Sequence, residues 1–114
     1  MKTITTDGLK KLRKDNERFV LIDVLSKAQF DKDHIPGATN VPLDTKDFAG
    51  LVANKASGGK NRKIVVYCGG PDCDASSKAV KLLMTGGFTS VTEYEGGLAA
   101  WRESGGSRMS KSKP

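Results

Sequence analysis

The chain has 114 residues, a length that favours a single domain able to bury about two thirds of its unfolded surface. Its 19 lysines and arginines against 13 acidic residues give a net charge of +6. No stretch approaches the roughly 20 apolar residues of a membrane span, and the first five residues contain no apolar run typical of a secretory signal. We therefore expect a cytoplasmic protein with no membrane partner, in which Cys68 and Cys73 need not form a disulfide.

The excess positive charge lies mainly in two segments, 55–63 and 108–113. Neither segment is interleaved with aromatic side chains, and no nucleic-acid-binding motif is present. Solvated surface accounts for this charge better than affinity for nucleic acid, so no nucleic-acid partner is expected. The composition of 105–114, mainly glycine, serine and basic residues, predicts a flexible basic tail after a domain that spans 1–104.

Apolar periodicity and capping residues predict helices that alternate with strands along the chain. Thr6 or Asp7 can cap the first helix, Ser26 the second, and Asp44 or Thr45 the third. The predicted helices are 6–14, 27–31, a segment through 52, 76–85 and 98–102, and the predicted strands are 19–22, 40–41, 63–67 and 89–94. Segment 54–63 is polar, contains two adjacent glycines, and is predicted to be a loop. This alternation indicates an α/β fold with a mainly parallel sheet.

One of the predicted strands ends at a cysteine. The apolar run Ile64–Tyr67 leads to Cys68, a tight turn of two glycines and a proline follows, and a helix is predicted from Ser76. In open α/β sheets, ligands bind outside the carboxyl ends of the strands. The thiol therefore occupies the place where such a fold carries its chemistry.

The loop after Cys68 can make a thiol reactive. A free cysteine has a pKa of about 8.5, and the unpaired backbone N–H groups at a helix N-terminus favour its thiolate. Cysteine is also among the most buried residue types, so Cys68 taken alone slightly favours a structural role, and the adjacent Gly69 and Gly70 shift the balance towards a functional one. Cys73 fits a resolving thiol, a second sulfur carrier or an incidental loop residue.

Several cysteine chemistries do not match the spacing. Cys68 and Cys73 are not in a CxxC motif, and His34 is the only other soft ligand, too few for a structural zinc site. The phosphatase pattern of a cysteine followed six positions later by arginine also fails, because Asp74 and Ala79 occupy those positions. No metal site is expected.

Four segments in order resemble the single-domain rhodanese-like sulfurtransferases. They are Val20–Val24 with Phe30, the segment His34–Pro42, Val65–Cys68 with its loop and the following helix, and Glu95–Trp101. Together they extend over nearly all of the chain except the tail. The resemblance implies a rhodanese-like α/β fold: a five-stranded, mainly parallel sheet flanked by helices on both faces.

The resemblance also implies a reaction. Cys68 would be catalytic: it would take sulfane sulfur from a donor such as thiosulfate or a persulfide, and pass it to a thiophilic acceptor such as cyanide or a thiol. Its partners would be these small sulfur-containing anions and persulfides or thiols, with no cofactor and no metal. Asp23 and His34 would support the site by fixing backbone, not by chemistry. The persulfide- and substrate-binding loop would comprise Gly69, Gly70, Asp72, Cys73 and Asp74.

Departures from the family pattern leave alternatives open. The loop is longer than in compact members, and it carries Asp72 and Asp74 where a cation often assists an anionic donor; Lys78 is the nearest cation in sequence. Leu25 stands where the family often has arginine. A non-catalytic interaction module and a Cys68–Cys73 thiol redox switch therefore remain alternatives, and Cys73 remains a second candidate nucleophile.

Overall fold

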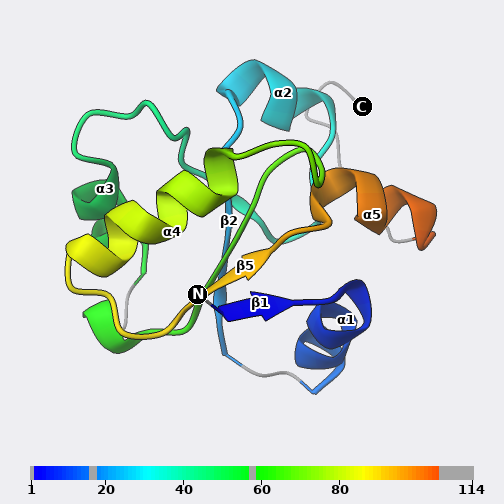
Figure 1. Cartoon of the computed structure of the whole chain (residues 1–114), viewed down its shortest axis with the longest axis horizontal. Helices are drawn as coiled ribbons and strands as arrows, with labels where there is room; N and C mark the ends of the chain where they lie inside the picture. Colours follow the sequence, from blue (N-terminus) through cyan, green and yellow to red (C-terminus); the bar gives the residue numbers. More distant parts are fainter. Residues whose placement is uncertain (1, 16–17, 57–58, 106–114) are drawn as a thin grey trace.

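The computed structural model describes residues 2–15, 18–56 and 59–105, which form one sheet with helices packed against it (Figure 1). The strands are β1 (Lys2–Ile4), β2 (Val20–Asp23), β3 (Thr39–Asn40), β4 (Ile64–Tyr67) and β5 (Val91–Tyr94). The helices are α1 (Thr6–Lys14), α2 (Lys27–Lys32), α3 (Phe48–Lys55), the 3₁₀ turn η1 (Gly59–Asn61), α4 (Ala75–Thr85) and α5 (Gly97–Glu103).

The sheet has five strands in the order β1-β5-β4-β2-β3, and every neighbouring pair is parallel. This confirms the predicted five-stranded parallel sheet. All four residues of the central strand β4 are buried, which explains its uninterrupted apolar sequence, because a strand in a covered parallel sheet needs apolar side chains on both faces.

Helices cover both faces of the sheet (Figure 1). On one face, Ile64 and Val66 belong to a core that also contains apolar side chains of α3 and α4. On the other, Val65 and Tyr67 pack with side chains of α1 and α5. Cys68 belongs to the α3–α4 core, at the carboxyl end of β4. The strand alternation therefore directs the Cys68 side chain under the first turn of α4.

The helix starts show where local prediction succeeded and failed. Ser26 caps α2 as predicted and forms a reciprocal capping box with Gln29. Thr5, and not Thr6 or Asp7, caps α1 by accepting a hydrogen bond from the Gly8 N–H. Asp47, and not Asp44 or Thr45, caps α3. Several neighbouring polar residues can each serve as a cap, and packing of the helix against the sheet decides among them.

Three further boundaries differ from the prediction. β1 was not predicted, because three residues at a sheet edge are too few to show a pattern. Segment 54–63 is not wholly a loop, since α3 extends to Lys55 and η1 follows. The short strand is 39–40 and not 40–41. The predicted tail lies almost entirely outside the described residues. Among the described helices, none has the length and apolar character that a membrane crossing requires.

Candidate active site

The first turn of α5 holds the start of the cysteine loop. The carbonyl oxygen of Cys68 accepts a hydrogen bond from the Leu98 N–H at 2.9 Å, and that of Gly69 accepts one from the Ala99 N–H at 2.9 Å. These N–H groups belong to a helix start, where they have no partner within the helix. The chain after β4 is therefore fixed to a segment 30 positions later by backbone contacts that no side-chain pattern encodes.

Gly97 permits this close approach. Its φ is +62°, and a Cβ atom there would lie 2.5 Å from the Cys68 carbonyl oxygen and 2.8 Å from the Gly70 nitrogen. Any other residue at this position would meet both a strained backbone and a backbone clash. Gly97, the first residue of α5, thus allows the helix start to pack closely against the cysteine loop.

The Cys68 thiol lies in the protein interior. The residue is 1% exposed, and its Sγ donates toward the Ser76 Oγ at 3.3 Å and the Cys73 carbonyl oxygen at 3.5 Å. Burial raises the pKa of the Cys68 thiol, and the adjacent Ser76 hydroxyl and amide oppose this rise only in part. In this conformation Cys68 is therefore a protonated, covered thiol.

Cys73 differs from Cys68 in both its exposure and the direction of its pKa shift. It is partly exposed, and although burial raises its pKa, the neighbouring Cys68 thiol and the amides of Ala75 and Gly69 outweigh burial and leave the pKa of Cys73 lowered. Its own N–H donates to the Gly70 carbonyl at 3.0 Å and closes a turn. The loop amides expected around Cys68 thus act on the second thiol in this arrangement.

The Ser76 hydroxyl connects the Cys68 thiol to a buried carboxylate. Ser76 Oγ donates to Glu93 Oε2 at 2.7 Å, and Ser77 Oγ donates to the same oxygen at 3.1 Å. Glu93 is 4% exposed and Ser76 is 1% exposed. Glu93 was not predicted as a site residue, although a charged residue between Val91 and Tyr94 of a buried strand is a signal that points to it.

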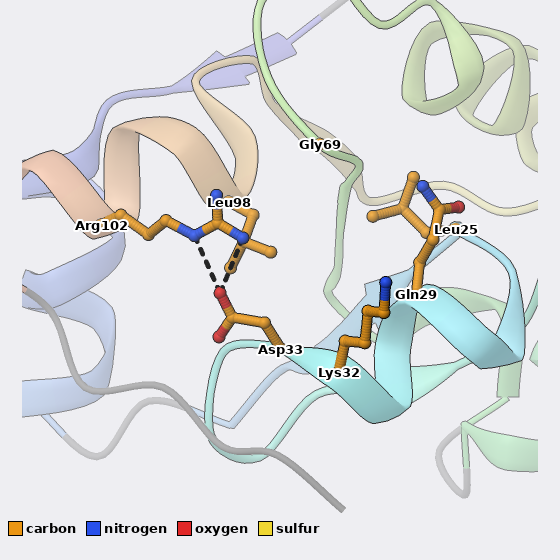
Figure 2. A pocket seen from close by; sticks show the side chains of 7 residues that line it. All are labelled: Leu25, Gln29, Lys32, Asp33, Gly69, Leu98 and Arg102. Atoms are coloured by element: carbon orange, nitrogen blue, oxygen red, sulfur yellow. Dashed lines mark hydrogen bonds and ion pairs between the residues drawn. The ribbon is translucent and has the colours of Figure 1, made fainter.

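A pocket of about 280 Å³ opens beside the cysteine loop (Figure 2). Lys32 of α2 and Arg102 of α5 bring cationic side chains to it, and Gly69 forms part of its wall. Arg102 is paired with Asp33, at 2.7 Å from Nη2 and 2.8 Å from Nε to the same carboxylate oxygen. Asp33 itself lines the pocket, and the remaining lining residues are Leu25, Gln29 and Leu98. Lys32 and Arg102 were not predicted as site residues, because their helices are distant in sequence from the cysteine loop.

The acidic residues of the loop lie on its outer surface. Asp72 is exposed, and Asp74 is ion-paired with Lys78 at 3.4 Å, with side chains 77% and 62% exposed respectively. Neither aspartate lines the pocket. Solvent screens such exposed charges strongly, so their effect on an anion in the pocket is smaller than the sequence suggested.

Asp23 and His34 hold backbone near the pocket. Asp23 Oδ1 accepts from the Leu25 N–H at 2.9 Å; burial raises the pKa of Asp23, and this hydrogen bond and the nearby Tyr67 hydroxyl and His34 ring oppose that rise. The His34 ring stacks on Phe30 with centroids 3.7 Å apart, and its Nδ1 donates to the Phe30 carbonyl at 2.7 Å. These contacts fix the two ends of α2, the helix that carries Lys32.

Comparisons with known proteins agree on one family. A family model described as the rhodanese-like domain matches residues 5–104. A thiosulfate sulfurtransferase from Arabidopsis thaliana chloroplasts is 32% identical over 93 residues, which are 74% of each chain. The solution structure of the rhodanese-like domain of an Anabaena protein superposes with a TM-score of 0.78, at 31% identity, over all of this chain and 84% of that one.

Some relatives are much longer than this chain. An adenylyltransferase and sulfurtransferase from Zea mays is 37% identical over 101 residues, which are 86% of this chain but 21% of the maize protein. The chain therefore corresponds to one part of that relative.

Proposed function

Because the chain belongs to the rhodanese-like domain family, we propose that it is a sulfurtransferase that carries sulfane sulfur as a persulfide on Cys68. The observation that supports this most is the place of Cys68 at the carboxyl end of the central strand, in one loop with a second thiol and directly before Gly69, which lines a pocket with the cation Lys32. Both cysteines are free thiols, as transfer through a thiolate requires. A reducing cytoplasm, the proposed location, keeps them so.

The first half-reaction requires a Cys68 thiolate. Its sulfur attacks the outer sulfur of a donor, the new S–S bond forms on Cys68, and the bond inside the donor breaks. With thiosulfate the leaving group is sulfite, which takes the electron pair of the broken bond. The reaction moves a neutral sulfur atom from one anion to another, so the total charge is unchanged. The second half-reaction repeats this step with a thiophilic acceptor, such as cyanide or a thiol, as the attacking group.

The pocket accounts for the class of donor. Lys32 favours a small anion, whereas the charge of Arg102 is offset by its ion pair with Asp33 in the same pocket. Gly69 in the pocket wall directly follows Cys68. Since Cys68 is 1% exposed, an anion held there reaches the sulfur only when the loop 69–74 shifts. Glycines in the loop make such a movement compatible with the backbone. A small anionic sulfane donor is thus the proposed substrate.

Intact-mass spectrometry after incubation with thiosulfate tests the proposal. The wild-type chain is expected to gain the mass of one sulfur atom, which a reductant removes. Cys68→Ser should lose this adduct and Cys73→Ser should retain it. An adduct that persists in Cys68→Ser and disappears in Cys73→Ser would assign the carrier role to Cys73, and no adduct with any sulfane donor would contradict the proposal.

A thiol redox switch is the second candidate, favoured by the interaction of the two thiols within one loop. Here Cys68 and Cys73 would form a reversible disulfide, with both thiol protons and two electrons passing to an oxidant such as a peroxide. Alkylation after mild peroxide should then show simultaneous loss of both free thiols. Loss of only one thiol, or of neither, would contradict this second role.

A further inference from the structure

Glu93 is a carboxylate inside an apolar layer. It occupies β5 on the same face as Val91, which belongs to the core between the sheet and helices α3 and α4. The residue is 4% exposed, and no ion pair to it is found among the residues that the structure describes. A buried carboxylate without a cation is costly unless hydrogen bonds satisfy it. The cost of burying Glu93 suggests that this carboxylate has a function beyond packing.

The hydrogen bonds around Glu93 have a defined direction. A carboxylate only accepts, so the hydroxyls of Ser76 and Ser77 must both donate to Oε2. With its proton directed at Glu93, the Ser76 oxygen offers its lone pairs to the Cys68 S–H at 3.3 Å. The three groups therefore form a directed chain from thiol to hydroxyl to carboxylate.

We propose that Ser76 and Glu93 form an internal proton acceptor that generates the Cys68 thiolate. The S–H bond of Cys68 breaks, its proton passes to Ser76 Oγ, and the hydroxyl proton of Ser76 passes to Glu93 Oε2. The electron pair of the S–H bond stays on sulfur, so no group is oxidised. The products are a thiolate, an unchanged serine hydroxyl and a neutral carboxylic acid. When an acceptor removes the sulfur atom, the same proton can return to Cys68.

Burial makes this path preferable to direct loss of the proton. The other partner of the Cys68 S–H is the Cys73 carbonyl oxygen, which accepts a hydrogen bond but is far too weak a base to keep a proton. Release to water would leave two negative charges, thiolate and carboxylate, in one buried layer, which is strongly unfavourable. Transfer to Glu93 keeps the number of buried charges at one. The proton transfer thus shifts the negative charge from the carboxylate to the sulfur and adds no second buried charge.

Few other titratable groups face this chain of hydrogen bonds. Among the described residues, the loop contributes Cys73, whose thiol interacts with Cys68. The start of α4 contributes the ion pair between its N-cap residue Asp74 and Lys78, whose side chains are 77% and 62% exposed. The neighbours of Glu93 in the sheet are Thr3 of β1 and Val66 of β4, neither of which titrates. Glu93 is the buried base connected to Cys68.

This proposal rests on the proposed role of Cys68, but its test measures the reactivity of the Cys68 thiol directly. In a Cys73→Ser background, Cys68 is the only thiol, and its alkylation by iodoacetamide can be followed from pH 6 to pH 10 without any sulfur donor. Glu93→Gln and Ser76→Ala should each lower the rate at pH 7 by at least about tenfold, since general base assistance is worth more than that in enzymes. Both variants should approach the parent rate at high pH, where hydroxide removes the proton. The double variant should be no slower than either single one.

Two control variants separate this role from a structural one. Ser77→Ala removes the other hydroxyl donor of Glu93 but leaves the path from Cys68 intact, and Glu95→Gln makes the same charge change at an exposed position of the chain. Glu95→Gln should keep the parent pH profile. Ser77→Ala should not slow alkylation at pH 7, because the path from Cys68 through Ser76 to Glu93 remains. Thermal unfolding should show that all variants are folded.

Three results would overturn the proposal. An unchanged profile in Glu93→Gln would show that the carboxylate is not the base. A faster reaction at pH 7 would show that its charge only opposes the thiolate. Equal losses in Ser76→Ala and Ser77→Ala would indicate a structural role. Each of these results concerns the ionisation of Cys68 and is distinct from a failure to form a persulfide.

Discussion

At the scale of single residues, the two cysteines differ in position, accessibility and pKa. A reactive nucleophile usually has a suitable position, an accessible sulfur and a lowered pKa in the same residue. Cys68 has the position that the family pattern predicts, but it is covered and protonated; Cys73 is accessible and has the lowered pKa. In the proposed reaction, the burial of Cys68 would protect its persulfide from solvent and from other thiols. A buried Cys68 also needs an internal base and a loop that opens, and Ser76 with Glu93 can supply the base.

Lys32 is the residue that most directly tests the anion pocket. Lys32→Gln should raise the KM for thiosulfate by about two- to fivefold, the range expected of an exposed ion pair, and leave kcat nearly unchanged. The effect should shrink as ionic strength rises. Lys27→Gln, on the same helix but outside the pocket, is the matched control. Equal KM values for the two variants would remove Lys32 from donor recognition.

At the scale of elements, the junction of β5 and α5 shapes the active loop. Gly97→Ala should destabilise the chain by about 1–3 kcal/mol from backbone strain alone, and more from the clash with Cys68 and Gly70. It should also slow persulfide formation in the fraction that remains folded. The control is Gly105→Ala, at φ +78° with open space around the new Cβ, which should show the cost of strain without a clash. Chemical denaturation and mass analysis measure the two effects, and equal stability losses would contradict the role assigned to the close approach.

The elements themselves could be predicted where a pattern is long. The central strand shows four buried apolar residues in a row, and α4 has regular apolar spacing. β1 could not be predicted, since pairing with β5 and not its own composition makes it a strand. The pocket cations could not be predicted either, because Lys32 and Arg102 meet only through the fold. The cysteine loop was found from sequence, but which sulfur faces solvent depends on how residues 69–76 turn.

At the scale of the whole molecule, β4 contributes side chains to both cores, so we expect the two faces of the sheet to unfold together. Val65 packs toward α1 and α5, and Val66 toward α3 and α4. Val65→Ala and Val66→Ala should each lower the free energy of unfolding by about 1–3 kcal/mol. Trp101, the single tryptophan, lies in the α1–α5 core, so its fluorescence should report the Val66→Ala change as fully as circular dichroism does. Separate transitions by the two probes would show that the faces unfold independently.

Transfer of sulfur, and not its binding alone, defines the proposed activity. The most direct measurement loads the chain with thiosulfate, removes the free donor, and adds cyanide. Formation of thiocyanate is then followed together with the mass of the protein. The proposal predicts one thiocyanate for each sulfur lost from the chain, and none from Cys68→Ser treated in the same way. A loaded chain that keeps its sulfur in the presence of cyanide, or equal thiocyanate from Cys68→Ser, would contradict it.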